Sequence, residues 1–436
     1  MAPDPFGSPE KGVSGVHVIG AGLAGLACAL RLSLAGVRVT VYEAAGHAGG
    51  RCRSFFDENL GCTIDNGSHM MLGANEATRR YLADAGSEDA VTEIAPAAFP
   101  FVDVPSGERW RVAPGPGPIP FWLLDRDRRV AGSALGDYFG IARLAFAGPG
   151  DTVSDRVGSA GRLYERFWQP LCRAVLNTDA SEGSARLLWR MIGDTFLRGE
   201  KACRPFFFGK GLSAALVDPV LKTLADKGAA IRFHARLRAI VFDDDRASAL
   251  AFADDTVDVG AEGTVVLAVP PDVCAALVPE CGAPLRSNPI LNAHYRLNDP
   301  VELPWGMPFL GLTGTEAQWL FARDDSVSVT VSAAHRLIDR PGDDLADFLW
   351  REIAPVLDRP RDPIPPCRII KERRATIAQT PAEVARRPKT RTGRRNVLLA
   401  GDWTDTGLPA TIEGSILSGF RAAEAATGTG GVARAA

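Results

Sequence analysis

The sequence Val16-His-Val-Ile-Gly20-Ala-Gly22-Leu-Ala-Gly25 decides the fold of this chain. Its first four residues are rich in β-branched side chains and predict a buried strand, and the glycines follow at once. An alanine- and leucine-rich segment then predicts a helix as far as Leu34, and Gly36 marks its end. Residues 37–42 predict a second strand, which ends before Glu43. The N-terminal part of the chain therefore predicts a β-α-β unit.

The spacing of the three glycines is typical of a turn that binds the pyrophosphate of a dinucleotide. Gly20 allows a tight turn, Gly22 lets backbone N–H groups approach a phosphate, and Gly25 lets the helix pack closely on the strand. A carboxylate at Glu43 is placed to accept hydrogen bonds from ribose hydroxyls, which favours an adenosine without a 2′-phosphate. The residues expected to contact the dinucleotide here are Gly20, Gly22, Leu23, Ala24, Gly25 and Glu43.

Two further turns favour FAD over a nicotinamide dinucleotide. Gly49-Gly50-Arg51 begins six residues after Glu43 and fits the adenosine-diphosphate end of a flavin, with Arg51 near a phosphate. Asp65-Asn66-Gly67-Ser68-His69 is a polar turn able to bring backbone amides close to an isoalloxazine ring. Each turn also has a plain structural interpretation, as a Gly-Gly turn with a surface arginine and as an Asx turn.

The C-terminal part of the chain supplies a third piece of the expected flavin site. Residues 396–400 predict a strand, and Gly401-Asp402 follows it, so an acid stands at the carboxyl end of a parallel strand, where cofactors bind. Residues 412–426 predict a helix that begins at Ile412. Its N-terminus offers N–H groups and a positive dipole to the N1/O2 edge of a flavin.

The middle of the chain differs in character from both ends. Pro- and Gly-rich turns separate predicted helices at 77–85, 134–146, 161–177 and 184–198. Strand patterns return at 230–233, 239–242, 249–252 and 264–269. We therefore predict an α/β fold: a Rossmann-like, discontinuous FAD-binding domain with an inserted α+β substrate domain. The predicted boundaries are 1–85, 209–285 and 390–436 for the FAD-binding domain, and 86–208 and 286–389 for the substrate domain.

Composition limits the classes of protein to which the chain belongs. Its 436 residues are 46% hydrophobic and 23% charged, which is ordinary for a folded protein and excludes a disordered chain. A net charge of −3 at pH 7 gives no basic surface of the kind that binds nucleic acid, so we expect no nucleic-acid partner. The eight cysteines include no C-x-x-C pair, so we expect no metal site. Residues 1–11 lack the apolar core of a secretory signal, so we expect a cytoplasmic protein.

Residues 116–147 form the stretch most similar to a membrane-surface anchor. No window of the chain reaches about 18 uninterrupted apolar residues, so we expect no spanning helix. Phe121 and Trp122 precede the charged run 125–129, and Phe139 and Phe146 follow it. This combination fits either an interfacial anchor or an ordinary buried helix. The anchor interpretation predicts peripheral contact with the inner face of the cytoplasmic membrane.

These motifs resemble those of the flavin-containing amine oxidoreductase superfamily, which includes monoamine oxidases, protoporphyrinogen oxidase and carotenoid desaturases. Within it the chain is most similar to the bacterial hydroxysqualene dehydroxylases, through Asp65-Asn-Gly-Ser-His-Met-Met-Leu-Gly73, Phe167-Trp-Gln-Pro-Leu-Cys-Arg-Ala-Val-Leu-Asn-Thr178 and Thr406-Gly-Leu-Pro-Ala-Thr-Ile-Glu-Gly-Ser415. The resemblance implies bound FAD and an apolar tunnel in the substrate domain. It adds Leu237, at a strand position that faces the adenine, to the expected FAD contacts.

One position departs from the pattern of the amine oxidases. They commonly carry a lysine on a substrate-domain strand, where it holds a water against flavin N5. The matching stretch here, Ile290-Leu-Asn-Ala-His-Tyr295, places Asn292 at that position. This departure weakens an amine oxidase interpretation.

The resemblance implies that reduced FAD converts hydroxysqualene to squalene and water, in squalene and hopanoid biosynthesis. Hydroxide is a poor leaving group, so a general acid should protonate it. The candidates by motif position are His69, Asp65, Tyr164 and Glu413. Aromatic faces stabilise a developing cation, and the candidates for this role, which are also ordinary core residues, are Phe167, Trp168 and Phe207. The flavin needs an external electron donor, whose identity the sequence leaves open.

Two alternatives stay open on the sequence alone. One is a carotenoid or squalene-type desaturase of the same fold, in which hydride moves to the flavin. The other is a non-catalytic escort for prenyl lipids or prenylated proteins. The nearly complete set of flavin positions argues against the escort.

Overall fold

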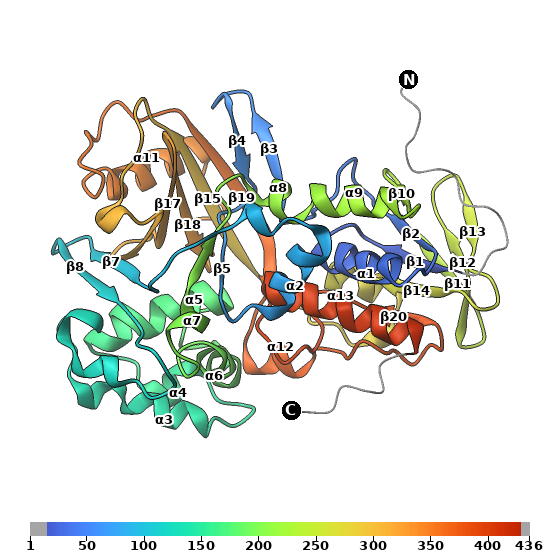
Figure 1. The fold of residues 1–436 in the computed structure, drawn as a ribbon, viewed down its shortest axis with the longest axis horizontal. Coiled ribbons are helices and arrows are strands. Elements are labelled where there is room, and N and C mark those ends of the chain that lie inside the picture. Colours follow the sequence, from blue (N-terminus) through green and yellow to red (C-terminus); the bar gives the residue numbers. More distant parts are fainter. Residues whose placement is uncertain (1–14, 429–436) are drawn as a thin grey trace.

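The computed structural model describes residues 15–428. Residues 1–11, on which the expectation of a protein without an export signal rests, lie outside this range. Figure 1 shows a sheet covered by α1 and α13 at one end of the molecule, and a larger sheet with its own helices at the other.

The N-terminal β-α-β unit lies in a five-stranded parallel sheet. The strand order is β10-β2-β1-β14-β20, and all neighbours are parallel. The strands are almost wholly buried because both faces of the sheet are covered, which is usual for parallel sheets. Their bounds are β1 Val16–Ile19, β2 Val39–Tyr42, β10 Ala230–Arg232, β14 Thr264–Leu267 and β20 Val397–Leu399.

Helices from both ends of the chain lie side by side on one face of this sheet. They are α1 Leu23–Leu34 and α13 Ile412–Thr427, and α9 Asp218–Asp226 joins them (Figure 1). A Cβ at Gly419 would lie 2.2 Å from the carbonyl oxygen of Ala24, so only glycine allows this approach of α13 to α1. The other face is covered by the antiparallel strands β11 Ala239–Asp243, β12 Arg246–Ala251 and β13 Thr256–Asp258, with α10 Pro271–Leu277.

The strands of the parallel sheet come from three separate parts of the chain. All five lie inside the ranges that we assigned to the FAD-binding domain. The strands of the larger sheet lie inside the two ranges that we assigned to the substrate domain. We keep the boundaries as our proposal for how the chain divides.

The larger sheet has seven strands in the order β19-β15-β18-β17-β16-β7-β8. Its neighbours are antiparallel except for β16 and β7. Helix α11 Gly342–Ile353 buries Leu345, Leu349 and Trp350 against one face. The strand bounds are β7 Phe99–Asp103, β8 Glu108–Val112, β15 Ser287–Arg296, β16 Phe309–Thr313, β17 Trp319–Arg323, β18 Ser326–Ser332 and β19 Cys367–Ile377.

A helical layer covers the opposite face of the seven-stranded sheet. Its core includes Trp168 and Leu188 from the helices, and Trp319 and Phe321 from β17. The helices are α3 Gly140–Ala145, α4 Val153–Val157, a π-helix at Tyr164–Trp168, α5 Gln169–Leu176, α6 Ala185–Asp194 and α7 Glu200–Cys203.

Short elements connect the two parts. β3 Ser54–Asp57 and β4 Cys62–Asp65 form a hairpin, and β9 Pro205–Phe207 pairs with both β5 Met70–Leu72 and β6 Thr92–Glu93. The other helices here are α2 Glu76–Ala85, α8 Leu212–Leu216 and α12 Pro381–Ala385.

Two of the predicted helices are wrong as continuous elements. Residues 134–146 form a 3₁₀ helix at Leu135–Phe139 followed by the short α3, since glycines at 136 and 140 weaken a regular helix. Residues 161–177 begin with Gly161 at φ 95°, which no helix accepts. The chain then widens into the π-helix just before Pro170, which has no N–H for an α-helical hydrogen bond.

None of the helices between residues 15 and 428 is both long and apolar enough to cross a membrane. The stretch 116–147 holds only short helical turns, at Phe121–Leu124, Arg126–Arg128, Leu135–Phe139 and α3.

Candidate flavin and substrate site

The glycine-rich turn between β1 and α1 has one open position. A Cβ at Gly20, where φ is 106°, would lie 2.4 Å from the carbonyl oxygen of Ala268, and a Cβ at Gly25 would lie 1.9 Å from that of Gly20. At Gly22, by contrast, no atom lies within 4 Å of the Cβ position. The first and third glycines therefore serve close packing, and the second opens onto free space at the N-terminus of α1, where a phosphate fits.

Glu43 is oriented at the end of β2 by two backbone amides. Its Oε2 accepts a hydrogen bond from the N–H of Ala21 at 2.8 Å, and its Oε1 accepts one from Ala45 at 2.8 Å. Each carboxylate oxygen keeps a further lone pair for a ribose hydroxyl. The carboxylate is thus fixed beside the glycine turn before any ligand binds.

The second glycine turn lies directly on the first. The N–H of Gly49 donates to the carbonyl of Ala21 at 2.8 Å, and Gly22 and Gly49 form an isolated parallel bridge. A Cβ at Gly50 would lie 3.3 Å from the Cα of Gly22. The turn predicted to bind the pyrophosphate and the turn predicted at the adenosine-diphosphate end of the flavin are therefore in contact.

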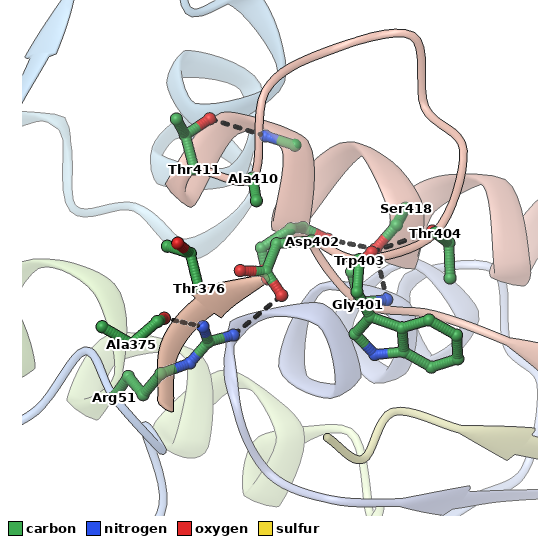
Figure 2. Close-up of polar contacts among 12 residues, drawn as sticks. Arg51, Ala375, Thr376, Gly401, Asp402, Trp403, Thr404, Ala410, Thr411 and Ser418 are labelled. Carbon is green, nitrogen blue, oxygen red and sulfur yellow. Dashed lines mark hydrogen bonds and ion pairs between the residues drawn. The ribbon is translucent and has the colours of Figure 1, made fainter. Parts of the chain in front are cut away.

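An ion pair joins the N-terminal and C-terminal pieces of the expected site. Figure 2 shows the guanidinium of Arg51 donating to Oδ1 of Asp402 at 2.8 Å and to the carbonyl of Ala375. The buried Asp402 carboxylate raises the pKa of Arg51, which therefore stays charged. The expectation that Arg51 lies near a phosphate remains a prediction, since the contacts of its side chain are with Asp402 and β19.

The residues around Asp402 are held by backbone hydrogen bonds. The N–H of Gly401 donates to Oγ of Ser418 at 2.8 Å, and Oγ1 of Thr404 donates to the carbonyl of Gly401 at 2.8 Å (Figure 2). Helix α13 begins at Ile412, after Thr411, whose hydroxyl accepts from the N–H of Gly414. A helix N-terminus leaves its first N–H groups without partners inside the helix, which fits the expected contact with a flavin edge.

Leu237 lies between β10 and β11, and its side chain is buried in the cluster that contains Ile19 and Tyr42. Only its main chain is therefore left to face an adenine. That contact stays a prediction.

Two of the four acid candidates are committed to other contacts. Asp65 accepts from Oγ of Ser54, from the N–H of Leu212 and from Nη2 of Arg323, the last at 2.6 Å. Glu413 accepts from the N–H groups of Ala77 and Thr78 and from the Thr78 hydroxyl, so it caps helix α2. Burial raises the pKa of Glu413, whereas the hydrogen bonds from Thr78 and Ala77 oppose this effect and hold the carboxylate in place. We therefore no longer propose Asp65 or Glu413 as the acid.

Tyr164 lies in the π-helix Tyr164–Trp168. Its hydroxyl is 3.2 Å from Oγ of Ser154 and 3.4 Å from Oε1 of Gln169. Phe167 and Trp168, in the same helix, are buried and pack edge to face with ring centroids 4.9 Å apart. These contacts make Phe167 and Trp168 core residues, and they argue against a role for either in facing a cation.

His69 and Phe207 line one polar pocket. The pocket lies between the turn 65–69, which we call the flavin turn because we predict it at the isoalloxazine ring, and the seven-stranded sheet. Burial lowers the pKa of His69, with the Asp65 carboxylate opposing and Arg51 adding to this effect, so the imidazole is neutral. The full lining is Thr63, Ile64, Asp65, Ser68, His69, Phe207, His294, Phe321, Arg323, Ser326 and Ser328. The apolar tunnel implied by the resemblance stays a prediction.

The sequence analysis missed His294 and Arg323, which contribute to this pocket from β15 and β17. The signal for His294 was present: it follows Asn292 by two residues, so both side chains lie on the same face of a strand. Asn292 does meet the flavin turn, with its Nδ2 3.5 Å from the carbonyl of Asn66. Arg323 had no local signal, because its partner Asp65 is 258 residues away.

Comparison with known proteins agrees with this geometry. Residues 23–427 match the model of the family described as flavin containing amine oxidoreductase. A hydroxysqualene dehydroxylase from Rhodopseudomonas palustris is 46% identical over 411 residues, which cover 94% of this chain and 97% of that protein. A second, from Sinorhizobium fredii, is 43% identical over 94% of this chain and 98% of its own length. Phytoene desaturases match at only 20–23% identity.

Solved structures confirm the predicted α/β fold class. An oxidoreductase from Methanosarcina mazei superposes with a TM-score of 0.70 at 14% identity, over 94% of this chain and 99% of that one. At this identity the likeness shows the fold alone. The match of the family model and the identities above show more, since the model covers residues 23–427 and the relatives cover 94% of this chain. The chain is an FAD-dependent oxidoreductase that belongs to the flavin containing amine oxidoreductase family.

Proposed function

We propose that this protein catalyses the reductive dehydroxylation of hydroxysqualene to squalene. The observation that carries the proposal is the 46% identity to a protein named hydroxysqualene dehydroxylase, which extends over 94% of the chain. The match also covers 97% of that relative's own length. The weaker match to desaturases makes that alternative the runner-up, and the intact flavin turns argue against an escort without chemistry.

The reaction requires one C–O bond to break and one C–H bond to form. Reduced FAD, when bound, supplies the hydride from N5. The chain must hold the cofactor through the two glycine turns and Glu43, and must supply a proton so that the hydroxyl leaves as water. The polar pocket lies beside the turn 65–69, which we predict at the isoalloxazine ring, so the pocket is where a leaving hydroxyl would meet protein donors.

A single-turnover experiment tests the proposal. The holoenzyme is reduced anaerobically with a deuteride donor and mixed with hydroxysqualene, and the product is analysed by mass spectrometry. We expect flavin reoxidation only when hydroxysqualene is added, and squalene that carries one deuterium. Squalene without label would remove the flavin as the direct donor. Reduction of oxidised flavin by added squalene would favour the desaturase.

We also propose that residues 116–147 contact a membrane surface, which a C30 hydrocarbon substrate requires somewhere on the enzyme. The structure divides this stretch into a buried set, which includes Trp122 and Leu144, and an exposed set. Phe139 and Phe146 are 75% and 81% exposed. The exposed set is Ile119, Phe121, Leu124, Leu135, Phe139 and Phe146, and such residues on short amphipathic turns are typical of interfacial anchors.

Vesicle binding tests the anchor. Replacing Phe139 and Phe146 with serine should release the holoenzyme from phosphatidylglycerol-containing vesicles without changing its flavin spectrum. Phe56→Ser is the matched control, because Phe56 is 62% exposed on the β3–β4 hairpin, outside the stretch. Equal sedimentation of the double variant and the parent would show that the stretch is ordinary surface.

A further inference from the structure

Strand β15 presents two polar side chains to the flavin turn. Asn292 and His294 lie on one face, and their cross-strand neighbours on β18 are Thr330 and Ser328. Oδ1 of Asn292 accepts from the Thr330 hydroxyl at 2.8 Å. A Cβ at Gly67 would lie 3.1 Å from Nδ2 of Asn292, so the sheet meets the turn closely. His294, two residues further along β15, lies on the same face of the strand as Asn292.

The imidazole of His294 is fixed on one side and unsatisfied on the other. The side chain is 2% exposed, and its Nδ1 lies 2.7 Å from Oγ of Ser328. Its Nε2 is buried and has no hydrogen-bond partner of regular geometry among residues 15–428. A hydrogen bond between the ring and the backbone of Asp65 is the weakest of the effects that raise the pKa of His294, so this contact leaves Nε2 poorly satisfied. A buried polar atom left unpaired costs about 1–3 kcal/mol, so native proteins keep one only where a water or a ligand completes it.

A second unpaired donor lies in the same pocket. Nη2 of Arg323 binds Asp65 at 2.6 Å and the carbonyl of Phe208 at 3.3 Å, while its Nε is buried without a partner in the described chain. Because Asp65 neutralises the guanidinium, the pocket suits a neutral oxygen better than an anion. Phe207 and Phe321 supply its apolar walls.

The charges around His294 keep it neutral. Burial lowers its pKa to about 4; the carboxylates of Asp65 and Asp57 oppose this effect and Arg323 adds to it. A neutral imidazole whose Nδ1 accepts the hydroxyl hydrogen of Ser328 carries its own hydrogen on Nε2. That hydrogen is a donor for an oxygen in the pocket.

We propose that Nε2–H of His294, together with Nε–H of Arg323, binds the hydroxyl oxygen of the substrate, and that His294 protonates this oxygen as the C–O bond breaks. The inference rests on the proposed function. As the Nε2 proton moves to the leaving oxygen, Nδ1 takes the hydroxyl proton of Ser328. In the same step Ser328 takes a proton from solvent, so that neither an imidazolate nor an alkoxide is left. The balance is one hydride from reduced flavin, one proton from solvent, one C–H bond formed and one water released.

The other candidates fit this role less well. Asp65 and Glu413 already accept hydrogen bonds from neighbouring protein groups. The hydroxyl of Tyr164 lies within hydrogen-bond distance of Ser154 and Gln169. His69 shares the pocket, and burial lowers its pKa as it lowers that of His294. Within residues 15–428, no hydrogen bond orients the ring of His69 as Ser328 orients that of His294.

The test measures binding and turnover separately. Oxidised holoenzyme, which cannot react, is titrated with hydroxysqualene and with squalene, and the change in the visible flavin spectrum gives each affinity. One hydroxyl-specific hydrogen bond should make the alcohol bind at least about tenfold tighter than the hydrocarbon. His294→Leu should abolish this preference. His294→Gln, whose amide N–H lies near the position of Nε2, should keep most of it.

Single turnover then separates donation from binding. The amide of His294→Gln cannot transfer its proton, so the rate of squalene formation should fall about a hundredfold or more. His335→Gln is the matched control: it makes the same change in the same domain, on an exposed histidine after β18. It should leave both measurements unchanged.

The outcomes distinguish the two proposals. If the parent enzyme makes no squalene, the proposed function fails whatever His294 does. If the parent makes squalene and both His294 variants keep the preference and the rate, the assignment of His294 is overturned. Should His294→Leu lose its flavin or fail to fold, the comparison of His294→Gln with His335→Gln decides.

Discussion

Substitution of two glycines in the first turn should separate folding from cofactor binding. A Cβ at Gly25 would lie 1.9 Å from the carbonyl oxygen of Gly20, whereas real Cβ contacts stay above 3.0 Å. Helix α1 must therefore move by about 1 Å away from β1, and overpacking of this kind costs about 1–3 kcal/mol. Since the clash is with backbone, which cannot rotate away, we expect Gly25→Ala to lose about 3 kcal/mol of unfolding free energy.

Gly22→Ala should have the opposite effects. Gly22 has φ −73° and ψ 175°, which alanine adopts freely, and nothing lies within 4 Å of its Cβ position. The flavin-free protein should be as stable as the parent, or more stable by about 0.4–1 kcal/mol through the unfolded state. The new methyl group would occupy the space expected for a phosphate. Loss of charge-assisted hydrogen bonds there should weaken FAD binding by about 1.5–3 kcal/mol.

Urea denaturation of the flavin-free protein and fluorescence titration with FAD measure the two effects. Gly193→Ala is the matched control: the position lies in helix α6 with nothing within 4 Å of its Cβ, so stability should hold or rise and FAD affinity should stay unchanged. FAD affinity equal to that of the parent in Gly22→Ala would refute the placement of the pyrophosphate at this turn. An unaltered stability of Gly25→Ala would refute the packing argument.

Three further changes test neighbouring groups. Glu43→Ala should weaken FAD binding by about 1–3 kcal/mol, measured by the same titration, because ribose hydroxyls lose their acceptor; unchanged affinity would remove Glu43 from the site. Asp402→Asn should lower the unfolding free energy by only about 1 kcal/mol, since the Arg51 side chain is 43% exposed. Burial lowers the pKa of His294 from 6.5 to about 4, so its contribution to stability is complete above pH 6.5 and is lost as pH falls through 4. The unfolding free energy of the parent relative to His294→Gln should therefore fall by up to about 3 kcal/mol between pH 7 and pH 4, whereas His335→Gln should follow the parent. A constant difference would mean that folding leaves the pKa of His294 unchanged.

The flavin turns were predictable because their signals are local. Gly20, Gly22 and Gly25 act on atoms within the same turn or the adjacent strand, and Glu43 is oriented by Ala21 and Ala45. Such contacts depend on the sterics and hydrogen bonds of a few residues close in sequence. The helix from 412 was predictable for the same reason, since its cap at Thr411 and its apolar face depend on residues that are close in sequence.

The carboxylates Asp65 and Glu413, which we no longer propose as the acid, have their deciding contacts with residues distant in sequence. Glu413 opens a helix in a motif that fits a flavin edge, yet its side chain reaches Ala77 and Thr78, more than three hundred residues away. In the sequence, Asp65 belongs to a polar turn with no charged partner nearby. In the structure, β17 places Arg323 beside it. A carboxylate that seems free along the chain is thus neutralised by a partner that only the fold supplies.

The same distant contacts couple the two parts of the molecule. The Asp65–Arg323 ion pair joins the flavin turn to β17, and Arg51 reaches both Asp402 and the carbonyl of Ala375 on β19. A ligand that orders either glycine turn therefore also stabilises the docking of the seven-stranded sheet, by mass action on the folded state. It follows that FAD binding should complete the pocket around His294. Since Asp65 accepts from Arg323, our proposal takes the proton for the leaving hydroxyl from His294, which this docking buries beside them.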